Sequence, residues 1–224
     1  MCSVSLSQPA AARVILLTGP SGSGKSSLAA LTGLPVLRLD DFYKEGDDPT
    51  LPLMSGGSHG SVDWDSAASW NAEAAMAAVR ELCATGRAAV PVYEISTSSI
   101  TGAAPVDLGG APLFIAEGIF AADIVAPCRE LGLLADALCL SRGAVTTARR
   151  RFVRDLREGR KSVRFLARRG WSLMRAERTI VARHAELGAY VCGRGEALER
   201  IRGAGRVPEP VAPVAPVAPV VVEA

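Results

Sequence analysis

The sequence is poor in the residues on which several kinds of functional site depend. Its 224 residues include only two histidines, and its five cysteines lie at neither metal-ligand nor redox-motif spacing. No apolar run approaches the roughly 20 residues that span a bilayer, and the N-terminus lacks the pattern of a signal peptide. We therefore expect no membrane contact, no histidine-based metal centre, reduced thiols and a cytoplasmic location. We also expect both histidines, His59 and His184, at the surface.

Aromatic residues are scarce as well, at 5% of the chain, and the formal net charge is only +2. The basic residues are nevertheless concentrated between Arg142 and Arg183. This segment contains thirteen arginines and one lysine but only three acidic residues. A nucleic-acid surface usually combines a strong positive charge with interleaved aromatic residues. Because the net charge is modest and aromatic residues are not interleaved with the basic ones, we expect no nucleic-acid partner.

Short apolar runs alternate with helical patterns along the chain. Strands are expected at 14–18, 36–40, 88–93, 113–117 and 135–140, and 101–112 is expected to form a loop. Helices are expected from residue 25, over 65–83 with Asp65 as cap, and over 145–158 and 171–187. This alternation predicts an α/β fold with a parallel sheet flanked by helices. Residues 1–12 are expected to be flexible, and the Val-Ala-Pro repeats of 204–224 to form a disordered tail.

A glycine-rich segment between the first strand and the first helix has the pattern of a phosphate-binding loop. Residues 19–26 read Gly-Pro-Ser-Gly-Ser-Gly-Lys-Ser and match G-x-x-x-x-G-K-[ST] in full. Backbone N–H groups of such a loop point at phosphate oxygens, the lysine reaches the outer phosphates, and the serine hydroxyl ligates Mg²⁺. We expect ATP and Mg²⁺ to bind here. The expected contacts come from Gly19, Ser21, Gly22, Ser23, Gly24, Lys25, Ser26 and Ser27.

Acidic residues follow two of the predicted strands. Asp40 and Asp41 end the second apolar run, and Glu117 ends the run at 113–117. In open α/β sheets, ligands bind beyond the carboxyl ends of the strands. Phosphoryl transfer needs one carboxylate to accept the proton of the attacking hydroxyl and another in the metal shell. Asp40 is predicted for the first role and Glu117 for the second, whereas Asp41 is as well explained by a turn.

The order of several motifs resembles uridine kinases and their phosphoribulokinase-like relatives. After the P-loop come Leu-Asp-Asp-Phe-Tyr at 39–43, Pro-Val-Tyr-Glu at 91–94 and Ile-Ala-Glu-Gly-Ile-Phe at 115–120. The resemblance implies a P-loop NTPase fold, with a kinase domain over 13–203 that could form a homo-oligomer. It implies that Asp40 is the catalytic base, that Asp65 binds ribose hydroxyls and that Tyr93 packs on the base. The His-Pro-Asp that follows the family's aspartate is Ser-Ala-Ala here.

The arginine-rich segment resembles the lid that closes over the phosphates in this family, here residues 149–170. The resemblance places Arg154 on the ATP phosphates, as a catalytic group, and Arg151 and Arg160 on the substrate side. Planar guanidinium groups suit phosphate charge. The later arginines, through Arg183, are expected to form a solvated basic face.

Two positions depart from the family and bear on the substrate. The histidine and arginine that contact the pyrimidine in uridine kinases are Ser98 and Ile100 here. The sequence predicts an MgATP-dependent kinase that phosphorylates a hydroxyl of a small molecule, with a uridine- or cytidine-type nucleoside as first acceptor. A non-nucleoside alcohol is an alternative acceptor. A regulatory module that binds ATP without catalysis is an alternative function.

Overall fold

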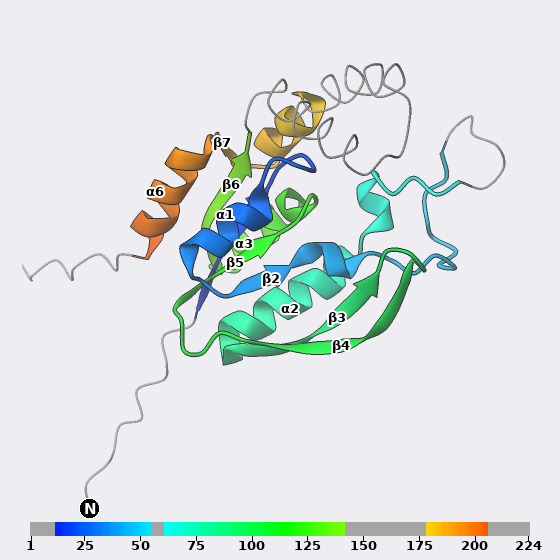
Figure 1. Cartoon of the computed structure of the whole chain (residues 1–224), viewed down its shortest axis with the longest axis horizontal. Helices are drawn as coiled ribbons and strands as arrows, with labels where there is room; N and C mark the ends of the chain where they lie inside the picture. Colours follow the sequence, from blue (N-terminus) through cyan, green and yellow to red (C-terminus); the bar gives the residue numbers. More distant parts are fainter. Residues whose placement is uncertain (1–11, 55–60, 142–177, 206–224) are drawn as a thin grey trace, which may run out of the picture.

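The computed structural model describes residues 12–54, 61–141 and 178–205. A five-stranded parallel sheet lies at the centre, in the order β2-β5-β1-β6-β7 (Figure 1). The strands of this sheet are β1 (Arg13–Thr18), β2 (Val36–Arg38), β5 (Leu113–Glu117), β6 (Leu134–Leu140) and β7 (Tyr190–Cys192). The predicted parallel sheet flanked by helices is therefore confirmed.

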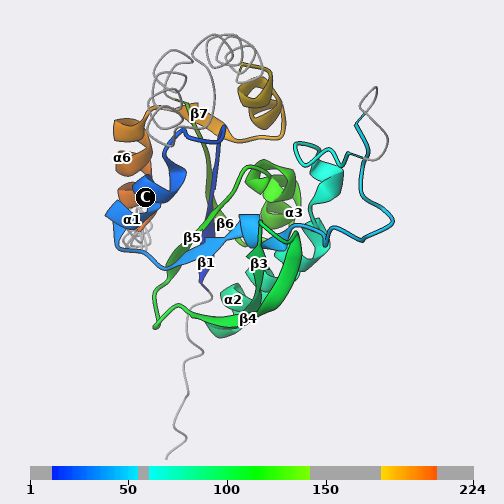
Figure 2. The same cartoon turned by 45° about the vertical axis from the view of Figure 1, so that its right-hand side comes forward.

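Helices cover both faces of the sheet. The α-helices are α1 (Lys25–Thr32), α2 (Ala72–Thr85), α3 (Val125–Glu130), α6 (Arg194–Ala204) and a helix whose described part is 178–186. Figure 2 shows α1 and α6 on one side of the sheet and α2 and α3 on the other. Among the described residues, none of the helices combines the length and the apolar character that a membrane crossing requires.

The alternation of side chains along β1 explains why its whole run is apolar. Val14 and Leu16 belong to the core cluster formed with α2 and α3, whereas Ile15 and Leu17 belong to the cluster formed with α1 and α6. A parallel strand covered on both faces needs apolar residues at every position. The run at 113–117 has the same character, with all five residues buried.

The helix predicted over 65–83 begins later than expected. Asp65 does not cap it, because α2 starts at Ala72 and the side chain of Asn71 accepts a hydrogen bond from the amide of Ala74 at 3.0 Å. Asparagine is among the strongest helix N-caps. The end of the helix is as predicted: Gly86 has a φ of 76° and donates from its amide to Leu82 at 2.9 Å.

The expectation of a loop over 101–112 was wrong for residues 101–107 and correct for residues 108–112. Strand β4 (Ser99–Asp107) pairs antiparallel with β3 (Arg87–Glu94), and this hairpin lies beside α2, outside the main sheet (Figure 1). Gly102 and Pro105 weaken the strand pattern of the sequence, but Pro105 lies on an edge strand, where a missing N–H is tolerated. The pairing with β3 thus overrides a weak local preference.

The second strand and one histidine also differ from what the sequence predicted. The second strand ends at Arg38 and not at Asp40, because residues 39–42 form a 3-10 turn. His184 is 1% exposed and not at the surface. The predicted lid over 149–170, the Val-Ala-Pro repeats, the first eleven residues, Cys2 and His59 lie outside the described residues. The other four cysteines are free and buried thiols, as expected.

Candidate active site

The phosphate-binding loop connects β1 to α1 at the carboxyl edge of the sheet. Gly19 has a φ of 139°, and a Cβ at this position would lie 2.6 Å from the carbonyl oxygen of Leu140. Gly24 has a φ of 96° and directly precedes α1. These conformations favour glycine and let the loop curl tightly. The buried Lys25 donates from Nζ to the carbonyl oxygen of Gly19 at 2.8 Å, so its ammonium lies inside the loop.

A hydroxyl and a carboxylate meet at the start of α1. Ser26 donates from Oγ to Oε1 of Glu117 at 2.8 Å. Glu117 is the last residue of β5 and only 7% exposed, and it pairs in register with Leu17 of β1. Mg²⁺ binds oxygen ligands and usually keeps several waters and substrate phosphates in its shell. A serine hydroxyl and a buried carboxylate beside a phosphate-binding loop are a donor set that fits this ion.

Asp40 is held at the rim by the loop that follows β5. Its Oδ1 accepts a hydrogen bond from the amide of Ile119 at 3.2 Å. Gly118 makes this approach feasible, because a Cβ there would lie 2.9 Å from Oδ1 of Asp40 and 2.8 Å from Cβ of Leu39. The neighbouring Asp41 lies 3.6 Å from a guanidinium nitrogen of Arg38, and burial raises its pKa.

These groups surround one cleft of about 520 Å³. Its phosphate side comes from the loop and α1, and its opposite side from the 3-10 turn, the loop after β5 and the hairpin. The lining residues are Ser21, Gly22, Gly24, Lys25, Ser26, Ser27, Asp40, Tyr43, Asp65, Ile95, Glu117 and Ile119. Ser23 is fully buried behind this lining, and its amide donates to Pro20 at 3.0 Å. The predicted residues Lys25, Ser26, Asp40, Asp65 and Glu117 therefore lie around a common space.

Tyr43 joins the cleft to a cluster of aromatic rings. Its ring centroid lies 5.9 Å from those of Trp64 and Tyr93. Burial, followed by the negative charges of Asp40 and Asp65, raises the pKa of Tyr43, so its hydroxyl stays protonated and donates to the carbonyl oxygen of Trp64 at 3.5 Å. Tyr93 does not line the cleft; it donates from its hydroxyl to the carbonyl oxygen of Lys44 at 3.1 Å and packs behind Tyr43.

The two positions that differ from the family bind the chain that follows Asp40. The carbonyl oxygen of Ser98 accepts a hydrogen bond from the amide of Gly46 at 2.7 Å, and the amide of Ile100 donates to Oε1 of Glu45 at 3.1 Å. Ser98 has a φ of 49°, which is uncommon outside glycine. Neither Ser98 nor Ile100 lines the cleft. These positions thus attach the tip of the hairpin to residues 45–46.

The arginines predicted to meet phosphate and substrate, Arg151, Arg154 and Arg160, lie outside the described residues. Arg183 is described and forms an ion pair with Asp123. It therefore differs from the solvated basic face predicted for the later arginines, because its guanidinium is held by a specific carboxylate.

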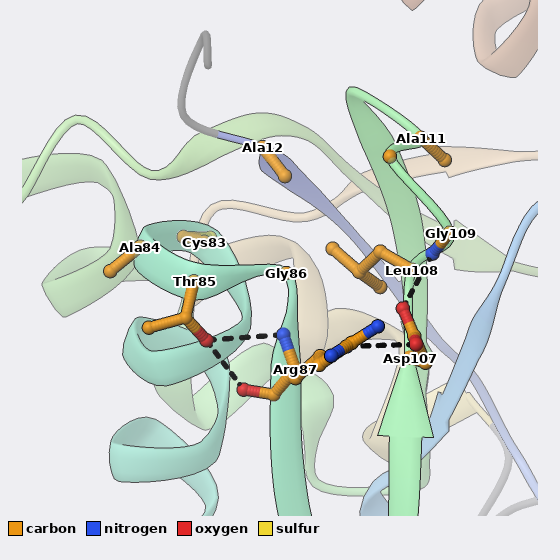
Figure 3. A pocket seen from close by; sticks show the side chains of 11 residues that line it. Ala12, Cys83, Ala84, Thr85, Gly86, Arg87, Asp107, Leu108, Gly109 and Ala111 are labelled. Atoms are coloured by element: carbon orange, nitrogen blue, oxygen red, sulfur yellow. Dashed lines mark hydrogen bonds and ion pairs between the residues drawn. The ribbon is translucent and has the colours of Figure 1, made fainter. Parts of the chain in front are cut away.

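A second hollow, of about 390 Å³, lies at the other end of β1 (Figure 3). Its lining includes Ala12, which precedes β1, and the chain on either side of Gly86. Its charged side chains are already engaged, because Arg87 donates to Asp107 at 2.9 Å. A strand rises about 3.3 Å per residue, so the six residues of β1 separate this hollow from the phosphate-binding loop. It takes no part in the chemistry of the cleft.

Sequence reasoning assigned no role to Tyr43, Ile95 and Ile119, which also line the cleft. Two of them lie in or directly beside motifs that the sequence shows. Tyr43 is the last residue of the Asp-x-Phe-Tyr element, and Ile119 directly follows Glu117-Gly118. Ile95 follows the predicted strand at 88–93, and only the pairing of the hairpin brings it to the cleft.

Neither a protein-family model nor a curated protein sequence matches the chain. Several solved structures, in contrast, are similar to the chain. A candidate fructose transport system kinase from Silicibacter sp. TM1040 is 21% identical over 77% of this chain and 85% of its own, with a TM-score of 0.54. A candidate uridine kinase from Bacillus stearothermophilus is 18% identical over 63% of this chain and 77% of its own, with a TM-score of 0.43. The chain therefore shares the α/β fold of the Silicibacter structure.

Proposed function

We propose that the protein is an MgATP-dependent kinase that phosphorylates a hydroxyl of a small molecule. The observation that supports this most directly is the placement of Lys25, Ser26, Glu117 and Asp40 around one cleft. Three groups suited to bind phosphates and Mg²⁺, namely Lys25, Ser26 and Glu117, lie together, and the exposed carboxylate of Asp40 lies across from them. A binding module without catalysis would not need the second carboxylate in this position.

The roles follow from the chemistry of each group. The loop amides and Lys25 would bind the phosphates, and Ser26 and Glu117 would hold Mg²⁺, which would supply positive charge beside the transferred phosphoryl group. The acceptor hydroxyl forms the new bond to the γ-phosphorus as the bond from that phosphorus to the leaving oxygen of ADP breaks. Its proton passes to Asp40. Arg154, with Arg151 and Arg160, is proposed to add positive charge from the segment 149–170.

The acceptor is proposed to be an uncharged polyhydroxy compound, with a pyrimidine nucleoside as first candidate and a free sugar as second. Asp40 and Asp65 both line the cleft and can accept hydrogen bonds from hydroxyl groups. The resemblance to uridine kinases favours the nucleoside. The Silicibacter neighbour is described as a fructose transport system kinase, which favours the sugar.

The test is acceptor-dependent ADP release from MgATP, compared between the wild-type protein and Asp40→Asn. We expect the wild type to respond to uridine, cytidine or a free sugar, and we expect Asp40→Asn to lose turnover by a factor on the order of 10² to 10⁴ with ATP binding intact. Asp41→Asn is the matched control, because Asp41 pairs with Arg38 and does not line the cleft. Equal turnover in wild type and Asp40→Asn would refute the assignment of the base. ATP binding without turnover on any acceptor would favour the regulatory module.

A further inference from the structure

A buried histidine contacts the residue that leads into the phosphate-binding loop. His184 lies in the helix at 178–186, the first described element after residue 141, and is 1% exposed. Its Nδ1 lies 3.2 Å from Oγ1 of Thr18. Thr18 is the last residue of β1, is itself 1% exposed and directly precedes Gly19. The imidazole therefore supports the loop from behind, away from the cleft.

The hydrogen bonds of Thr18 fix the direction of this contact. Its hydroxyl donates to the carbonyl oxygen of Ile119 at 3.1 Å. Because a hydroxyl has a single proton, Oγ1 accepts from His184, which requires a proton on Nδ1. Burial lowers the pKa of His184 to about 4, so the ring is neutral at pH 7. Cys139 lies 3.7 Å from the same nitrogen and is at most a weak partner.

The same hydrogen bonds continue from Thr18 to Asp40, the predicted catalytic base. Ile119, which accepts from Thr18 through its carbonyl, donates through its amide to Asp40 at 3.2 Å. The preceding Gly118 is also tied to β1, since its amide donates to the carbonyl oxygen of Leu17 at 3.2 Å. A continuous series of hydrogen bonds thus runs from His184 through Thr18 and Ile119 to Asp40.

We propose that His184 is a positioning residue for the transfer reaction, which holds Thr18 and Ile119 so that Asp40 keeps its place at the rim of the cleft. This inference rests on the proposed function. It gives the helix at 178–186 a role besides packing, because the helix fixes the phosphate-binding loop and the base with one side chain. A displacement of about 1 Å in a reacting group can lower the rate by two orders of magnitude.

The experiment compares four variants by kcat, by KM for MgATP and by thermal unfolding. His184→Leu removes the donor and keeps apolar bulk, and Thr18→Val removes the hydroxyl with little change of shape. His184→Asn retains an N–H donor near the position of Nδ1 and serves as the rescue. Arg183→Met is the matched control, because Arg183 lies on the same helix as His184 but pairs with Asp123 and not with Thr18 or Ile119.

We expect His184→Leu and Thr18→Val each to lower kcat by about 10-fold or more. KM for MgATP should change by less than about 3-fold, because Lys25 and Ser26 are untouched. His184→Asn should recover most of the loss. The double variant should be no slower than the slower single variant, since both changes interrupt one path. Arg183→Met should lower the unfolding temperature and leave kcat unchanged.

Three results would overturn the role of His184 in an active enzyme. The first is an unchanged kcat in a folded His184→Leu. The second is a loss of kcat in Arg183→Met as large as that in His184→Leu. The third is a double variant whose fold-loss of kcat equals the product of the two single losses. Should His184→Leu fail to fold, Thr18→Val and His184→Asn decide the matter, because a path through Thr18 predicts loss in the former and activity in the latter. A wild-type protein that transfers no phosphate would overturn the proposed function itself, and this inference with it.

Discussion

Substitution of Gly118 by alanine tests the placement of Asp40 without touching any ionisable group. The new Cβ would lie 2.8 Å from Cβ of Leu39 and 2.9 Å from Oδ1 of Asp40, closer than real Cβ atoms approach. Leu39 cannot readily move, because it is fully buried and its carbonyl oxygen accepts from Nε1 of Trp70 at 2.7 Å. The strain must therefore be relieved by the Asp40 carboxylate and the turn that bears it.

Two effects of different size follow from this clash. Overpacking a well-packed site costs about 1 to 3 kcal/mol of folding free energy, which a domain of this size tolerates. A shift of several tenths of an ångström at the base should lower kcat by about 10- to 100-fold. ATP affinity should change little, because Lys25 and Ser26 lie on the other side of the cleft.

The assay measures kcat, ATP affinity and thermal unfolding for Gly118→Ala beside Gly203→Ala. Gly203 lies in α6, where an added Cβ would meet no atom within 4 Å. Alanine there should stabilise the helix by up to about 1 kcal/mol and leave kcat unchanged. If Gly118→Ala kept the wild-type kcat while losing stability, Asp40 would not be the group on which transfer depends. If it lost neither, the close packing of β5 against the 3-10 turn would be wrong.

Two further predictions concern the start of α2 and the buried histidine. Asn71→Ala should destabilise the protein by about 1 kcal/mol in urea unfolding, because it removes the cap of α2, whereas Asp65→Ala should leave stability unchanged and raise the KM for the acceptor. The pKa of His184 is about 4 in the folded protein and near 6.5 in the unfolded chain, so between these values the unfolded state binds the extra proton. Stability should therefore fall by up to about 3 kcal/mol as the pH drops from 6.5 to 4, and His184→Leu should lack this part of the loss when unfolding is followed across that range.

The sequence was most informative for elements whose structure is determined by the residues within them. β5 was predicted at its observed bounds and β1 and β6 to within one residue, because strands buried on both faces must be apolar throughout. The phosphate-binding loop was also predictable, since its glycines and lysine follow from the geometry of phosphate binding. Asp40 and Glu117 could be selected because the carboxyl edge of the sheet is known once the strands are known.

The sequence was least informative where distant parts of the chain decide. The strand β4 exists through its pairing with β3, and its own residues favour a loop. The burial of His184 depends on Thr18, which lies 166 positions away in the sequence. A single histidine on a helix carries no periodic pattern that tells a buried position from an exposed one. Its expected place at the surface was a general tendency of histidine, which the packing of this helix against β1 overrides.

The hairpin links the divergence at Ser98 and Ile100 to the kind of acceptor. Both residues use backbone groups to bind residues 45–46, and a Cβ at Gly46 would lie 3.0 Å from Cβ of Ser98. This close contact leaves the acceptor side of the cleft to Asp40, Tyr43, Asp65, Ile95 and Ile119. In the described part of that side, two carboxylates are present and no cation is. Carboxylates accept hydrogen bonds from hydroxyl groups and repel phosphate, so the described lining favours an uncharged polyol over an acceptor that is already phosphorylated.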